Sequence, residues 1–64
     1  MCLSSVYQKK EGENIFLCKN IARVIPGKTE TVVFDLMGQK TVLPGRILDI
    51  DLLENIILIE EEPA

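Results

Sequence analysis

The residue in this 64-residue sequence that is best placed to do chemistry is a cysteine directly after the initiator methionine. The Met1 amine, the Cys2 amide nitrogen and the Cys2 thiolate can form two fused five-membered chelate rings. Two nitrogens and one thiolate suit square-planar Ni(II) or Cu(II). Removal of Met1 would leave a smaller chelate of the Cys2 amine and sulfur, which a partner subunit could complete. The alternative is that Cys2 packs as a small hydrophobic residue in a β-strand.

Few other side chains could join such chemistry, because the sequence contains no histidine. The commonest metal ligand and the usual general base are therefore both missing. Cys18 shares a strand face with Phe16 and is expected to be a core thiol, although a Cys2–Cys18 pair holding a metal or a disulfide stays open. Asp49 and Asp51 could bind a hard cation, but they lack further oxygen ligands nearby and are expected to be solubilising charges. The prediction is a metal-binding protein with Cys2 as its ligand, and not an enzyme.

Length and composition indicate how such a site would be supported. A chain of 64 residues buries only about 60% of the surface that its unfolded form exposes. Eight Ile, eight Leu and five Val are more than so small a monomer hides easily, which predicts a homodimer. The sequence shows no secretory signal pattern and no apolar run of membrane-spanning length. With only two cysteines, it is expected in the reducing cytoplasm.

The charge pattern bears on nucleic acid as a ligand. Five basic residues fall within the first half of the chain: Lys9, Lys10, Lys19, Arg23 and Lys28. With Tyr7 and Phe16 they could form a basic and aromatic patch of the kind that stacks nucleobases. The net charge of −3 and the interleaved glutamates favour ordinary solvated charge instead. Nucleic acid is therefore not an expected ligand, and an RNA-binding β module is the alternative function.

The apolar pattern predicts an all-β fold. No segment carries an amphipathic helical stripe over three turns, and β-branched residues are prominent among the apolar ones. Short runs bounded by Gly, Asn, Asp and Pro predict strands over residues 2–9, 15–18, 21–25, 31–36, 40–43, 46–51 and 56–60. The expected architecture is a small barrel or closed sandwich of six to seven short strands. Residues 1–60 would form a single domain, and residues 61–64 an acidic tail.

Two of these segments carry specific orientation predictions. One face of segment 31–36 is expected to point into the core: Val32, Phe34 and Leu36. The alternate residues are expected to point outward: Thr31, Val33 and Asp35. Segment 56–59 is apolar on both faces, which predicts a central strand or one packed against a partner chain.

Several short stretches also resemble one known family when they are taken in order. They are Met1-Cys2-Leu3, Val6-Tyr7, Asp35-Leu36-Met37-Gly38, Pro44-Gly45-Arg46-Ile47, Asp49-Ile50-Asp51 and Ile57-Leu58-Ile59-Glu60. In this order and spacing the chain resembles, over its whole length, the CooT family of small nickel-binding proteins. One member accompanies the maturation of nickel-containing carbon monoxide dehydrogenase, and relatives have been labelled predicted RNA-binding proteins.

The resemblance implies a β-rich homodimer that binds Ni(II) through its N-terminal cysteine, here Cys2. Only Cys2 matches a residue with an assigned role, and Cys18 has no counterpart in the family pattern. The predicted function is that of a nickel metallochaperone or store, linked to maturation of a nickel enzyme such as carbon monoxide dehydrogenase. A maturation protein of such an enzyme is then the expected partner beside the second subunit.

Overall fold

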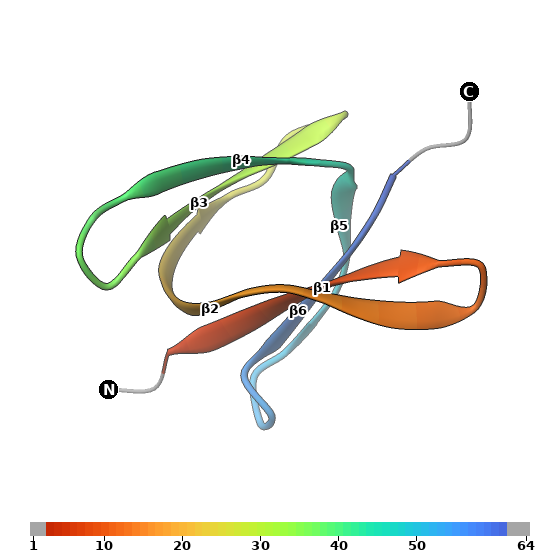
Figure 1. Cartoon of the computed structure of the whole chain (residues 1–64), viewed down its shortest axis with the longest axis horizontal. Coiled ribbons are helices and arrows are strands. Elements are labelled where there is room, and N and C mark those ends of the chain that lie inside the picture. The colour runs from red at the N-terminus through yellow and green to blue at the C-terminus, as the bar shows by residue number, and fades with distance from the viewer. Residues whose placement is uncertain (1–2, 62–64) are drawn as a thin grey trace.

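The computed structural model describes residues 3–61, and in this range it contains six strands and no helix (Figure 1). They are β1 (Ser4–Lys10), β2 (Glu13–Ile25), β3 (Glu30–Asp35), β4 (Lys40–Pro44), β5 (Arg46–Asp51) and β6 (Ile56–Glu60). The strands form one sheet in the order β4-β3-β2-β1-β6-β5, which curls into a half-barrel. The all-β class is confirmed. The expected acidic tail stays a prediction, because residues 62–64 lie outside the described range.

The sheet is antiparallel except between β1 and β6, which run parallel. The two edge strands, β4 and β5, are consecutive in the chain and are separated by Gly45 alone. This connection turns the chain from one edge of the sheet to the other and brings β5 against β3. The curl of the sheet therefore follows from a single-residue corner.

The Gly45 corner packs tightly against the end of β6. Gly45 has a φ of 113°, and a Cβ atom placed there would lie 2.8 Å from the carbonyl carbon and oxygen of Glu60. Its N–H donates to the Thr29 carbonyl at 2.8 Å, and its carbonyl accepts a hydrogen bond from the buried Thr31 hydroxyl at 3.0 Å. Both the backbone conformation and the space at this position therefore require glycine.

Strand β2 corrects one of the predicted boundaries. Segments 15–18 and 21–25 form one continuous strand, so the sheet has six strands instead of seven. Asn20 takes a φ of 60°, a left-handed conformation that asparagine tolerates, and its carbonyl accepts a hydrogen bond from Leu36 N–H at 2.9 Å. Register shifts on both sides of Asn20 mark bulges that bend β2 without ending it. The bend lets one strand serve both halves of the sheet.

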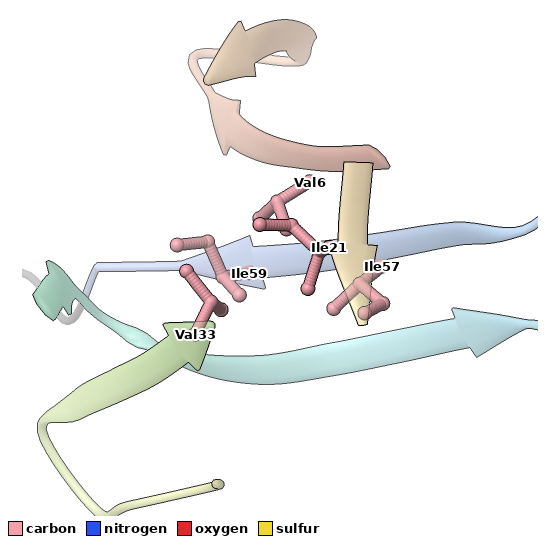
Figure 2. Packing of buried hydrophobic residues seen from close by; sticks show 5 residues of the cluster. All are labelled: Val6, Ile21, Val33, Ile57 and Ile59. Carbon is pink, nitrogen blue, oxygen red and sulfur yellow. The ribbon is translucent and has the colours of Figure 1, made fainter. Parts of the chain in front are cut away.

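The core lies inside the curl. It consists of five buried side chains from four strands: Val6, Ile21, Val33, Ile57 and Ile59. Figure 2 shows Val33 of β3 and Ile59 of β6 pointing toward one another across the interior. The outer faces of β3 and β6 therefore look away from each other. Within residues 3–61, no helix is long and apolar enough to cross a membrane.

The predicted orientation of β3 is wrong. Thr31 and Val33 are fully buried, whereas Val32 is only partly buried and Leu36 is 61% exposed in the turn after the strand. The strand is apolar on both faces, so its alternation does not show which face turns inward. Burial of Thr31 is compatible with its polarity because its hydroxyl donates to the Gly45 carbonyl at 3.0 Å.

Candidate functional site

The predicted ligand Cys2 lies outside the described residues, so its role stays a prediction. The chain that follows it is held on both sides as soon as β1 begins. Ser4 pairs with Ile21 of β2, and the Ser5 N–H donates to the Asn55 carbonyl at 2.9 Å. The central strand of the sheet therefore provides a fixed base directly after the N-terminal segment.

Cys18 has the surroundings of a core thiol. It pairs with Val6 in the β1–β2 ladder, is half-buried and packs against the hydrophobic core. Burial raises the pKa of the Cys18 thiol above its ordinary value, so the thiol stays protonated at neutral pH. A protonated thiol is a poor metal ligand. Whether Cys18 pairs with Cys2 stays open, since Cys2 is outside the described part of the chain.

The carboxylates with defined hydrogen bonds brace turns. The Asp51 Oδ1 accepts hydrogen bonds from the N–H groups of Leu53 and Glu54 at 3.0 and 2.9 Å. The Asp35 Oδ1 does the same for Met37 and Gln39, both at 2.9 Å. Within residues 3–61, no three His, Cys, Asp or Glu side chains are close enough together to hold a metal ion. Sequence analysis missed this turn-bracing role, although an aspartate before a turn is its usual signal.

The candidate basic and aromatic patch is divided by the fold. Lys9 and Lys10 lie at the end of β1 in the β1–β2 hairpin, whereas the Arg23 guanidinium lies 5.2 Å from the ring centroid of Phe34. Tyr7 and Phe16 pack edge to face, with ring centroids 5.6 Å apart and planes at 74°. The structure thus gives two separate aromatic sites on different parts of the sheet. It does not bring the five cations together around Tyr7 and Phe16.

Strand β6 is central and apolar on both faces, as predicted for segment 56–59. Ile57 and Ile59 point into the core, so Ile56 and Leu58 point outward. Leu58 lies in one cross-strand row with Tyr7 and Phe16, and Phe16 is 52% exposed. We call this outer surface the β6 face and define it by Tyr7, Phe16, Asp49, Asp51, Ile56 and Leu58.

Together these features define a small all-β half-barrel that presents an apolar outer face and carries a cysteine just before its first strand. Residues 1–60 match the family model described as CO dehydrogenase accessory protein CooT. The chain therefore belongs to the CooT family, as the sequence motifs indicated.

A solved structure supports the fold. The crystal structure of a candidate CooT from Carboxydothermus hydrogenoformans is similar, with a TM-score of 0.81 and 21% sequence identity. The similarity covers 97% of this chain and 100% of that one. At this identity, the likeness shows a shared fold. No curated protein matches the sequence.

Proposed function

We propose that this chain is a nickel-binding accessory protein for a nickel enzyme such as carbon monoxide dehydrogenase. It acts as a metallochaperone or nickel store and not as an enzyme. The observation that carries the proposal is the match of residues 1–60 to a family described as accessory to CO dehydrogenase. We place the protein in the cytoplasm, where reducing conditions keep a cysteine available as a ligand.

We assign Cys2 as the nickel ligand. A thiolate next to amine and amide nitrogens suits Ni(II), whereas the sequence offers no histidine as an alternative. The half-buried Cys18 is a weaker candidate because burial raises the pKa of its thiol. Protons compete with the metal for sulfur and nitrogen donors, so nickel affinity should fall as the pH falls.

The working form of the protein in this proposal is a homodimer seated on the β6 face. Only five side chains form the buried hydrophobic core within residues 3–61, which is little for an independent monomer. The β6 face carries the half-buried Tyr7, Ile56 and Leu58 next to the exposed Phe16. Strand β1, which follows Cys2, crosses this face, so a second copy seated there could supply further donors to the nickel.

Nickel titration of matched cysteine variants tests the assignment. Wild-type protein should develop thiolate-to-nickel charge-transfer absorption that saturates with added Ni(II). Cys2→Ser should abolish this absorption, whereas Cys18→Ser, the matched control, should retain it. Residues added before Met1 move the α-amine away while keeping the thiol, so they test the nitrogen donor separately. Normal nickel binding by Cys2→Ser would refute the proposed site.

A further inference from the structure

The outer surface of the other half of the sheet also carries an apolar row. Ile25 of β2, Val32 of β3 and Val42 of β4 lie side by side in register. Ile25 is 41% exposed and Val42 is 49% exposed, while Val32 between them is partly buried. Their inward neighbours Val24 and Leu43 pack on the core, so this row points away from it.

The neighbouring row adds positive charge. Arg23 and Lys40 flank Phe34 from the two adjacent strands, and the Arg23 guanidinium lies 5.2 Å from the Phe34 ring centroid. The row on the other side contains Glu30 opposite Pro44. We call this surface the β3 face and define it by Arg23, Ile25, Glu30, Val32, Phe34, Lys40 and Val42. It is apolar at its centre and carries a net positive charge.

The charge of the rest of the chain is distributed unevenly around this face. Residues 1–44 carry six basic and four acidic side chains, a net charge of +2. Residues 45–64 carry one basic and six acidic side chains, a net charge of −5. An acidic partner is therefore repelled by the β5–β6 half and attracted to the β3 face.

The β3 face stays open in the proposed dimer. Val33 and Ile59 point toward each other across the core, so the outer faces of β3 and β6 lie on opposite sides of the molecule (Figure 2). A second copy seated on the β6 face therefore leaves the β3 face accessible. One protomer then has two separate association surfaces of different charge.

Size and charge decide what the β3 face can bind. Three strands at a spacing of about 4.8 Å, read over three rows of side chains, give a surface of roughly a few hundred Å². A contact limited to this face is small, which suits a transient interaction. The cations Arg23 and Lys40 favour a partner that presents carboxylates at this surface. The single aromatic ring of the face, that of Phe34, already has the Arg23 guanidinium over it, so the face offers little for stacking RNA bases.

We propose that the β3 face docks a different protein, one that presents an apolar patch bordered by carboxylates. This inference rests on the proposed function, because it supplies the surface through which the nickel protein meets its recipient. Arg23 and Lys40 pair with the carboxylates, while Ile25 and Val42 cover the apolar patch. The contact is transient and weakens as the salt concentration rises.

The test uses nickel-free carbon monoxide dehydrogenase from the same organism as the probe, with binding followed by biolayer interferometry. Arg23→Glu/Lys40→Glu should weaken binding about tenfold or more. Lys10→Glu/Lys19→Glu makes the same change in net charge elsewhere on β1 and β2 and should leave binding within about twofold. Ile25→Ser/Val42→Ser should weaken binding without changing its salt dependence.

Further measurements separate this proposal from the alternatives. The Arg23→Glu/Lys40→Glu variant should keep wild-type nickel titration and wild-type mass by light scattering. A loss of dimer mass would make a second copy the occupant, and saturable RNA binding lost in the same variant would make RNA the occupant. Either result overturns the proposal, as does nickel-loaded wild-type protein that does not bind the enzyme. If Cys2→Ser bound nickel normally, the proposed function would be overturned instead. The docking proposal would then still be decided by the binding measured between the protein and carbon monoxide dehydrogenase.

Discussion

Alanine substitutions at two adjacent valines test which face of β3 forms the core. Val33 is fully buried in the interior with Ile59, whereas Val32 points outward and is partly buried. Val33→Ala and Val32→Ala remove the same atoms from neighbouring positions of one strand. The difference between their effects on the free energy of unfolding therefore reports on burial and not on the chemistry of the substitution. If the orientation expected from sequence were right, the larger cost would fall on Val32.

The structure sets the size of the two effects. Removing two buried methyl groups loses about 1.6 kcal/mol of transfer free energy, at about 0.8 kcal/mol each. A residual cavity of about 50 Å³ adds roughly 1 kcal/mol. Val33→Ala should therefore lower the free energy of unfolding by about 2.5 kcal/mol. Val32→Ala, at a partly exposed site, should cost less than about 1 kcal/mol.

Urea unfolding followed by circular dichroism measures both values. One protein concentration is used throughout, because the proposed dimer would add a concentration-dependent contribution to stability. For a domain of this size, about 2.5 kcal/mol corresponds to a Tm lower by roughly 10–20 °C. The urea dependence of the free energy should stay unchanged in both variants, which shows that the same surface is exposed on unfolding. Equal costs at the two positions, or a larger cost for Val32→Ala, would refute the orientation of β3.

Three further predictions follow from single positions. Gly45→Ala should destabilise the protein by about 2 kcal/mol or more in urea unfolding, because a Cβ there meets backbone atoms at 2.8 Å. Gly12→Ala has open space around its Cβ and should lower the free energy of unfolding by only about 1 kcal/mol. Because burial raises the pKa of the Cys18 thiol in the folded protein, this thiol ionises at lower pH in the unfolded chain. The free energy of unfolding should therefore fall as the pH rises above about 9. Urea unfolding at a series of pH values should show that Cys18→Ala lacks the part of this fall that comes from the thiol. Ile57→Lys should unfold the protein because Ile57 is in the core, whereas Leu58→Lys should keep its circular dichroism spectrum and shift the proposed dimer to monomer in light scattering.

The strand boundaries were largely predictable because strand-breaking residues act locally. Segments 46–51 and 56–60 coincide with β5 and β6. Between them, Asp51 and Asn55 mark the turn: Asp51 accepts hydrogen bonds from the turn backbone, and Asn55 takes a φ of 57°. Similarly, Glu11 and Gly12 form a two-residue turn with φ values of 52° and 80° between β1 and β2.

Strand continuity and orientation were not predictable because they depend on distant contacts. Asn20 resembles a strand end in the sequence, but its left-handed conformation is accommodated by bulges and by the Leu36 N–H, which bonds its carbonyl. Thr31 resembles a solvent-facing residue until the Gly45 carbonyl, 14 positions away, accepts its hydroxyl hydrogen. In each case a residue that is distant in sequence provides the hydrogen-bond partner of a polar group. From the local sequence alone, that group would be expected to hydrogen-bond to water.

The candidate site, like the fold, is only partly predictable from the sequence. Cys2 is proposed from chelate chemistry that involves adjacent atoms only, so the sequence is sufficient to propose it, and its role stays a prediction. The two outer faces arise from pairing between distant strands, and no local motif marks them. The β3 face, for example, requires Ile25, Val32 and Val42 to meet across three strands. The register between these strands is a property of the whole fold.

The edges of the sheet give a reason for association through faces. An open half-barrel exposes β4 and β5, and exposed edges invite pairing with other chains. Here β4 begins with Lys40 and ends with Pro44, and β5 carries a register irregularity at Leu48, between Ile47 and Asp49. Lysine, proline and bulges each disfavour the addition of another strand. With both edges protected, the proposed contacts use faces of the sheet instead of its edges, and the apolar β6 and β3 faces are two such surfaces.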